Sequence, residues 1–207
     1  MINNNGFDYI DLCLPSGTLW ATCNVGANKP TDSGLYFQWG NTIGYSLDQI
    51  GRSKEKKPFD WDDYKFSVDG SDTKFNKYTN IGYNLDLHDD AAHINMGGDW
   101  HIPNIDQFRE LRDNTTSEWI TLDNTSGMKF ISKKDLTKYI FIPAAGYITN
   151  GKLINNGSEA YIWSSMLDTW SVWYGVYLDL YSKDSSNHIY MNNVGRNCGL
   201  SVRGVIG

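Results

Sequence analysis

Two stretches near the C-terminal end of the chain alternate in polarity with a period of two. In residues 174–182, Val176, Leu178 and Leu180 share one face, and a similar alternation recurs in residues 188–193 after a short polar turn. A period of two is the signature of a β-strand, because successive side chains point to opposite faces of a sheet. The pattern predicts two strands here and a fold that contains sheet.

The rest of the chain also has the pattern of short strands punctuated by Gly, Asn, Asp and Ser. The expected strands cover residues 7–14, 19–25, 35–39, 139–142, 162–167 and 200–205. Residues 149–152 (Thr-Asn-Gly-Lys) predict a type I′ hairpin, because Asn-Gly tolerates positive φ at both central positions.

Helical signals occur in only two places. Asp89 or Asp90 can cap a short helix over residues 91–96, which the following glycine pair ends. Asn104 and Gln107 have the spacing of a capping box, and an apolar stripe with spacings of three and four follows them. The chain therefore predicts an α+β fold with one or two short helices.

The chain has 207 residues, and neither an internal repeat nor a linker divides it. We expect a single domain over residues 1–207. Residues 41–87 are polar with scattered aromatics, which predicts a long loop insertion that its aromatic side chains hold against the body. The Asp-Gly-Ser-Asp stretch at residues 69–72 is interpreted as a turn rather than a calcium loop.

Charge and hydropathy exclude several partner classes. The net charge is −6, from 18 basic and 24 acidic residues, and Glu55 interrupts the short Lys54–Lys57 block. Nucleic acid and anionic membrane surfaces are disfavoured as partners, because both require a basic patch. Membrane insertion is not expected without an apolar run of about 18 residues, and the polar N-terminus shows no signal peptide.

Motifs for catalysis and for cofactors are absent from the sequence. It contains no nucleophile elbow, phosphate-binding loop, zinc-protease motif or Cys-x-x-Cys pair. His88 and His93 flank acidic residues, but a capped helix start is favoured over a metal cluster there. Cys13, Cys23 and Cys198 are interpreted as free thiols, with a Cys13–Cys23 pair as the alternative. We expect no enzyme activity, catalytic residue, cofactor or metal.

Six motifs in order resemble one protein family. They are residues 9–27 (YIDLCLPSGTLWATCNVGA), 34–40 (GLYFQWG), 89–92 (DDAA) with 97–103 (GGDWHIP), 141–147 (FIPAAGY), 161–165 (YIWSS) and 199–203 (GLSVR). This set resembles the major paralogous domain family of gut bacteria and their phages. That family is placed in the formylglycine-generating-enzyme-like branch of the C-type-lectin fold, with the variable proteins of diversity-generating retroelements.

The resemblance implies a C-type-lectin-like fold: small twisted antiparallel sheets, one or two short helices and long loops. It implies a C-terminal display region over residues 161–205, in which the first and last strands are scaffold and residues 166–198 form the exposed surface. The sequence departs from the family at Cys13, His101 and Gly204, where Gly, Arg and Pro are usual. The oxidase branch uses a C-terminal cysteine pair, and here only Cys198 lies in that region.

The candidate ligand-binding residues lie in this region. They are Asp168, Trp170, Trp173, Tyr174, Asn192, Asn193 and Asn197. Exposed Trp and Tyr give large contact areas at a low entropic cost, and both stack on sugar rings. Two alternatives stay open: that either tryptophan is instead part of the core, and that the asparagines form a plain turn near Gly195. Arg196 and Arg203 are candidates for structural ties between loops and body.

These observations predict a non-catalytic recognition domain, located extracellularly or on a virion surface. Its ligand would be a glycan or a host or cell-surface protein, as in an adhesin or a phage receptor-recognition protein. The resemblance to retroelement proteins adds the expectation that the site is hypervariable. The alternative is a structural domain for virion decoration or surface assembly, whose partners would be other virion or surface proteins.

Overall fold

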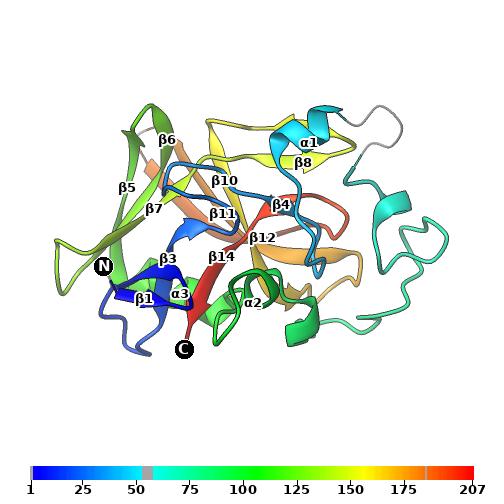
Figure 1. Ribbon diagram of the computed structural model, residues 1–207, viewed down its shortest axis with the longest axis horizontal. Coiled ribbons are helices and arrows are strands. Elements are labelled where there is room, and N and C mark those ends of the chain that lie inside the picture. Colours follow the sequence, from blue (N-terminus) through cyan, green and yellow to red (C-terminus); the bar gives the residue numbers. More distant parts are fainter. Residues whose placement is uncertain (1, 53–57, 185) are drawn as a thin grey trace.

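The computed structural model describes residues 2–52, 58–184 and 186–207 (Figure 1). The protein is a mixed α+β fold of small, mostly antiparallel sheets with few helices, as the sequence predicted.

The strands before the central helices are β1 (Ile2–Asn4), β2 (Phe7–Asp11), β3 (Leu19–Asn24) and β4 (Tyr36–Phe37). The helices and 3-10 turns are α1 (Leu47–Arg52), η1 (Trp61–Asp63), η2 (Leu87–Asp89), α2 (Ala91–Met96) and α3 (Ile105–Asn114). The later strands are β5 (Thr115–Leu122), β6 (Thr125–Ser132), β7 (Tyr139–Pro143), β8 (Tyr147–Thr149), β9 (Lys152–Ile154), β10 (Glu159–Leu167), β11 (Tyr174–Lys183), β12 (Ser186–Gly195), β13 (Leu200–Ser201) and β14 (Arg203–Ile206).

The strands form four sheets in the described part of the chain. The largest has the order β12-β11-β10-β13-β4, and a second joins both ends of the chain in the order β1-β2-β3-β14. The order β5-β6-β7 makes a third, and β8-β9 a two-stranded fourth. Figure 1 shows the two termini on the same side of the molecule, as this pairing of N-terminal and C-terminal strands requires.

The strand expected over residues 200–205 is divided between two sheets. Ser201 pairs with Tyr36 in the five-stranded sheet, whereas Arg203 pairs with Asn24 in the four-stranded one. Between them the carbonyl of Val202 accepts a hydrogen bond from the amide of Val25 at 2.9 Å. The sequence alternation could not show this change of sheet, because both halves are buried.

Turn chemistry fixes two hairpins. Asn150 (φ 48°) and Gly151 (φ 69°) join β8 to β9 with the positive φ angles that the type I′ prediction required. Asp123 (φ 46°) and Asn124 (φ 65°) make the same kind of connection between β5 and β6. The second hairpin was not predicted, although a polar pair that tolerates the left-handed conformation was its signal.

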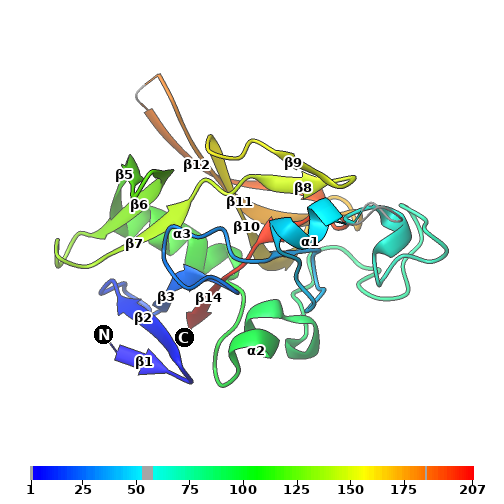
Figure 2. The ribbon, with the colours of Figure 1, turned by 45° about the horizontal axis from the view of Figure 1, so that its top comes forward.

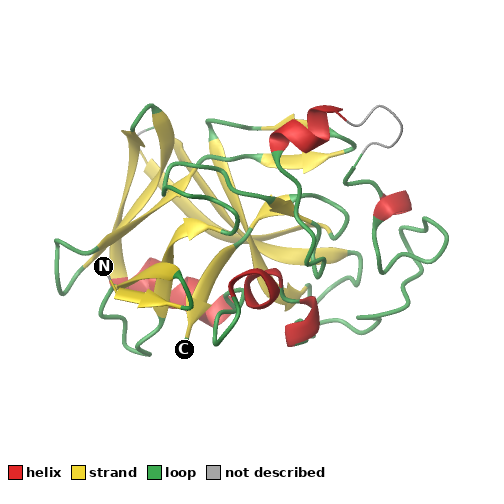
Figure 3. Ribbon diagram, in the orientation of Figure 1, coloured by secondary structure: helices red, strands yellow, loops and turns green. Residues whose placement is uncertain are grey.

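Both predicted helices are confirmed. The side chain of Asp90 accepts a hydrogen bond from the amide of His93 at 2.9 Å and caps α2. At α3 the side chains of Asn104 and Gln107 each accept from the backbone amide of the other, which completes the capping box. Figure 3 shows these helices packed beside the sheets (helices in red).

The five-stranded sheet is buried on both faces near its centre. Leu178 and Leu180 pack on one side with Phe108 of α3, whereas Tyr177 packs on the other with Trp163. The alternation in residues 174–182 is confirmed, but the face opposite Val176, Leu178 and Leu180 is also buried near the centre of the sheet. Tyrosine rings cover that face and have enough apolar area to join a core.

The insertion over residues 41–87 contains α1 and η1 and otherwise little regular structure. Its aromatics hold it to the body as predicted, with Phe59, Tyr64 and Tyr78 buried. Asp89 adds a polar anchor, because its carboxylate accepts from Lys65 Nζ at 2.6 Å and from Tyr78 Oη at 2.8 Å. Residues 53–57 of the predicted insertion, which include the Lys54–Lys57 block, lie outside the described part of the chain.

Candidate functional site

The 168–174 loop consists of the connection between β10 and β11 and the first residue of β11, and it carries the first group of candidate residues. Its two ends are joined by a hydrogen bond of 3.0 Å from the amide of Asp168 to the carbonyl of Tyr174. The amide of Gly82 donates to the carbonyl of Asp168 at 3.0 Å, so the insertion supports the base of the loop. Inside the loop, the amide of Trp170 donates to Asp168 Oδ1 at 3.0 Å. The backbone of the loop is therefore held at its base.

A buried arginine holds the other side of this loop. Arg196 is fully buried, and its Nη1 donates to the carbonyl of Val172 at 2.9 Å. Its backbone amide donates to the carbonyl of Trp173 at 3.0 Å. Burial lowers the pKa of Arg196, whereas its interactions with the hydroxyls of Tyr64 and Tyr78 oppose that change. Arg196 is thus a structural tie between loop and body, one of the roles considered from the sequence.

The large side chains of the loop face solvent. Trp170 is 90% exposed, and Trp173 and Tyr174 are 40% and 37% exposed. The rings of Trp173 and Tyr174 meet edge to face with centroids 6.4 Å apart. Neither tryptophan is part of the core, so the inward-facing alternative does not hold for them.

A shallow hollow of about 450 Å³ opens beside the loop. Trp173, Tyr174 and Asn197 line it on the side of the display region, and Asp60 and Trp61 line it from the insertion. The sequence analysis did not predict that residues of the insertion line this hollow. The signal that could have found it was the concentration of aromatics in a polar segment, which was interpreted as packing alone.

Two candidate residues are buried rather than displayed. Asp168 is 4% exposed, and its Oδ2 atom has no hydrogen-bond partner among the described residues. Asn197 is 6% exposed and sits in a tight turn in which the amide of Cys198 donates to the carbonyl of Gly195 at 2.9 Å. Asp168 therefore supports the loop through its bond to the Trp170 amide, whereas Asn197 lines the hollow.

Asn192 and Asn193 are exposed on β12 but point to opposite faces of the sheet. Asn192 pairs with Tyr177, and Asn193 pairs with Val176. Paired residues in an antiparallel sheet project to the same side. The structure therefore brings Trp170, Trp173 and Tyr174 together on one loop. By register Asn193 shares the face of Tyr174 and Val176, whereas Asn192 lies on the opposite face.

Arg203 is the second structural arginine, as preferred from the sequence. It is fully buried, and its guanidinium donates to Asn24 Oδ1 and to the carbonyls of Ala21 and Phe141, each at 2.9 Å. Burial lowers its pKa. The guanidinium joins β14 to β3 and β7, so this side chain belongs to the scaffold.

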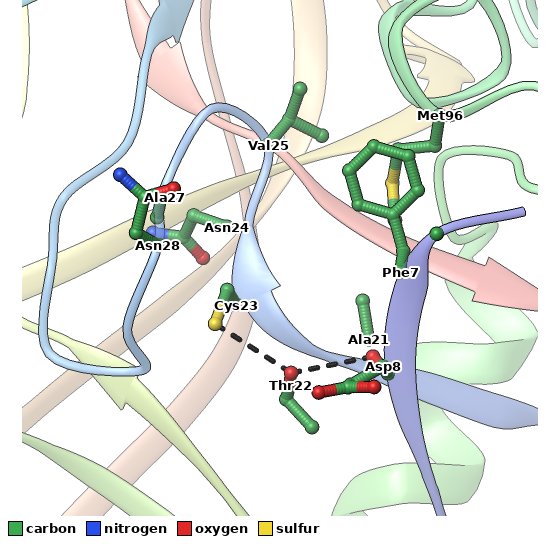
Figure 4. Close-up of a pocket in the computed structure, with 11 residues that line it drawn as sticks. Phe7, Asp8, Ala21, Thr22, Cys23, Asn24, Val25, Ala27, Asn28 and Met96 are labelled. Atoms are coloured by element: carbon green, nitrogen blue, oxygen red, sulfur yellow. Dashed lines mark hydrogen bonds between the residues drawn. The ribbon is translucent and has the colours of Figure 1, made fainter. Parts of the chain in front are cut away.

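A second pocket, of about 210 Å³, lies at the N-terminal sheet (Figure 4). Cys23 and Thr22 line it, and the Thr22 hydroxyl lies 3.6 Å from Cys23 Sγ and donates to the carbonyl of Asp8 at 3.3 Å.

The described residues contain no group of three or more His, Cys, Asp or Glu side chains placed to hold a metal ion. Cys13, Cys23 and Cys198 are free thiols, so the alternative of a Cys13–Cys23 pair does not hold. Burial raises the pKa of Cys198 to about 11. In the part of the chain that the structure describes, the helices are too short or too polar to cross a lipid bilayer.

Comparison of the chain with protein-family models, with curated proteins and with solved structures finds no match.

Proposed function

We propose that this chain is a non-catalytic ligand-recognition domain of the C-type-lectin-like fold, acting outside the cell or on a virion surface. Its ligand is a glycan or a cell-surface protein, and the contact is made by Trp170, Trp173 and Tyr174. The observation that carries the proposal is the 90% exposure of Trp170 at the tip of a loop whose base is fixed by hydrogen bonds.

An exposed indole on an anchored loop suits recognition for two physical reasons. Exposed apolar area of this size is removed from water only when a partner covers it. A loop whose backbone is already ordered loses little conformational entropy on binding, so more of the contact energy remains as affinity. Trp and Tyr side chains have few rotatable bonds, which lowers the entropic cost further.

The resemblance of the six sequence motifs to the major paralogous domain family supports the same assignment. It places the variable surface between two scaffold strands, and the 168–174 loop lies between β10 and β11 in that interval. The mixed α+β architecture agrees with the coarse fold that the resemblance implies. Hypervariability of this surface, as in retroelement proteins, is part of the proposal.

The test is binding to a glycan array and to whole host cells. The variant carries Trp170→Ala, Trp173→Ala and Tyr174→Ala, and Tyr139→Ala is the matched control because Tyr139 is 42% exposed on β7. We expect binding by the wild type and the control and at least about tenfold weaker binding by the triple variant. Equal binding by all three proteins would overturn the assignment of the site.

A structural role in virion decoration or surface assembly is the second candidate, because the same exposed rings fit a docking interface. Light scattering of the wild type and the triple variant separates the two functions. Self-association that the triple variant loses, together with no binding to glycans or cells, supports assembly.

A further inference from the structure

One face of the five-stranded sheet carries a concentration of tyrosines and carboxylates. The register pairs Tyr161 of β10 with Asp179 of β11, and Asp179 with Tyr190 of β12. Paired residues and residues two positions apart on a strand share a face. Asp179 is therefore surrounded on its own face by tyrosines at positions 161, 177, 181 and 190.

The rings form two groups: Tyr161 and Tyr177 are buried, whereas the outer group of Tyr181, His188 and Tyr190 is partly exposed. The centroids of Tyr161 and Tyr177 lie 5.2 Å apart. On the outer side, Tyr181 stacks on His188 with centroids 4.5 Å apart and an interplanar angle of 7°, and it lies 6.4 Å from Tyr190. The far end of the β11–β12 hairpin, which carries the outer rings, extends away from the body (Figure 2).

The carboxylate at the centre of these rings lacks a sufficient set of donors. Asp179 is 7% exposed, and its Oδ1 atom is buried without a hydrogen-bond partner among the described residues. Its Oδ2 atom has one donor, Asn192 Nδ2, at a long distance of 3.4 Å. Buried polar atoms are nearly always paired, so an unpaired carboxylate oxygen needs an explanation beyond the fold itself.

A second carboxylate lies beside the first. Glu159 pairs with Tyr181 across the two strands, on the same face as Asp179. Its Oε2 atom accepts hydrogen bonds from the Tyr161 hydroxyl and from Asn155 Nδ2, the latter at 2.9 Å. Burial raises the pKa of Asp179, the charge of Glu159 raises it further, and the Asn192 hydrogen bond opposes both.

These charges have no cation beside them in the described part of the chain. The ion pairs found there join other carboxylates to Lys or Arg, and neither Glu159 nor Asp179 takes part in one. Two carboxylates among aromatic rings make the local potential negative. The site therefore has what attracts a positive group, namely an unpaired acceptor and the negative faces of several rings.

We propose that this tyrosine–carboxylate face is a second ligand site, separate from the 168–174 loop, and that it binds a guanidinium group such as an arginine side chain of a partner protein. A guanidinium is flat, so it stacks on tyrosine rings, and its forked N–H groups match a carboxylate in two-point contact. It supplies the donor that Asp179 Oδ1 lacks. A quaternary ammonium ion fits the rings but donates no hydrogen bond to that atom.

The route to Asp179 lies along the edge strand. Asn192 and Tyr190 are both exposed on β12, and Asn192 makes the long contact with Asp179. Because that hydrogen bond is weak, a charge-assisted bond from a guanidinium to Asp179 displaces the Asn192 amide at little cost.

The test is an NMR titration of the whole chain, with the tyrosine ring signals as the readout. The probe is N-acetyl-arginine-N-methylamide. The neutral comparison is the citrulline analogue, which has nearly the same shape without the charge, and tetramethylammonium is a cation without donors. The variants are Asp179→Asn and Glu159→Gln, with Asp123→Asn in the exposed β5–β6 turn as a charge-matched control.

We expect saturable shifts of the tyrosine signals with the arginine probe and none with the citrulline analogue. Asp179→Asn should weaken binding by about tenfold or more, and Asp123→Asn should leave it unchanged. A peptide with one central arginine should bind more tightly than free arginine if the source of the group is a protein partner, and free arginine should bind at least as tightly if it is a small molecule.

Three results would overturn the proposal: no saturable shift with the arginine probe, equal shifts with citrulline or tetramethylammonium, or unchanged binding in a folded Asp179→Asn protein. The site is distinguishable from the loop, because the triple variant of Trp170, Trp173 and Tyr174 should bind the arginine probe as the wild type does. Loss of probe binding in that triple variant would show that the two surfaces are not separate.

Discussion

Arg196 Nη1 donates hydrogen bonds to the carbonyl of Val172 at 2.9 Å and to the carbonyl of Tyr78 at 3.0 Å. One buried guanidinium thereby joins the 168–174 loop to the long insertion. Its acceptors in the described structure are hydroxyl and carbonyl oxygens rather than carboxylates. The ring of Phe75 lies 4.0 Å from its central carbon and adds a cation–π contact. The exposed rings of the loop thus depend on a side chain that is itself fully buried.

Arg196→Lys should destabilise the protein and loosen the loop. A lysine keeps the charge but cannot reach these acceptors as a planar fork, so buried carbonyls lose their donors. We expect the free energy of unfolding to fall by about 2 kcal/mol. Urea unfolding measures the loss, and hydrogen exchange at the amides of Gly82 and Trp170 reports the loop.

Lys134→Arg, at an exposed position, is the control for exchanging one basic side chain for the other. It should change neither the free energy of unfolding nor the hydrogen exchange of these amides. An Arg196→Lys protein with wild-type stability and unchanged exchange at these amides would show that Arg196 does not hold the loop.

Trp170→Ala should leave stability almost unchanged, because the side chain is 90% exposed. Surface substitutions of this kind shift the free energy of unfolding by less than about 0.5 kcal/mol. Trp163→Ala is the matched comparison, since Trp163 is buried and its Nε1 donates to the carbonyl of Phe37 at 2.6 Å. It should cost about 3–5 kcal/mol.

Chemical denaturation of the two tryptophan variants gives the comparison directly. Acrylamide should also quench less of the total fluorescence once Trp170 is removed. A loss of several kcal/mol in Trp170→Ala would mean that the indole packs against the protein and is not available to a ligand.

The sequence predicted local structure well where a few neighbouring residues determine it. The Asn150-Gly151 hairpin and the Asn104–Gln107 capping box follow from the chemistry of adjacent residues, and both are present. The exposure of Trp170 was not decided by its neighbours in sequence. It depends on whether other segments cover the loop, and one sequence does not contain that information.

The candidate site was predictable only in part for the same reason. The loop residues were found because aromatics are concentrated there. The tie from Arg196 to Tyr78 joins residues separated by 118 positions, so no spacing rule detects it. Asp179 alternates with Leu178 and Leu180, so the sequence pattern puts it on the face opposite to theirs. Its burial arises because large rings on neighbouring strands cover it, which an alternating pattern does not reveal.

Asp89→Asn should weaken the anchor of the insertion. Burial raises the pKa of Asp89, but hydrogen bonds from Lys65, Lys77 and Tyr78 outweigh it and hold the pKa below its ordinary value. The carboxylate therefore contributes stability above its unfolded pKa, and this contribution is lost as the pH falls through the lower folded value. Both lysines are partly exposed, so we expect a modest cost of about 1–2 kcal/mol at pH 7.

Urea unfolding at pH 7 and at pH 3 tests this. The difference in the free energy of unfolding between the wild type and Asp89→Asn should be smaller at pH 3, because the wild-type carboxylate takes up a proton. A gap that is the same at both pH values would show that the lost contact is not electrostatic.

Asp179→Asn should stabilise the protein at pH 7, in contrast to Asp89→Asn. Burial and the charge of Glu159 raise the pKa of Asp179. A raised carboxyl pKa means that the folded state disfavours the ionised form. The ionised carboxylate therefore lowers the stability of the fold by its full amount above the folded pKa. This destabilisation decreases as the pH falls through that value and disappears below the unfolded pKa of about 3.9. The neutral amide avoids the penalty, and we expect a gain of about 1 kcal/mol at pH 7.

The stabilisation of Asp179→Asn over the wild type should become smaller between pH 7 and pH 4. Protonation of Asp179 in the wild type removes the same charge and recovers the same free energy. Urea unfolding across this range measures it, with Asp123→Asn as the control in which no pH-dependent gap is expected. A stabilised Asp179→Asn protein that no longer binds the arginine probe would show that the charge is kept for a ligand at the expense of stability. A destabilised variant would mean instead that Asp179 supports the fold, and the unpaired oxygen would then have a donor in solution that the described residues do not supply.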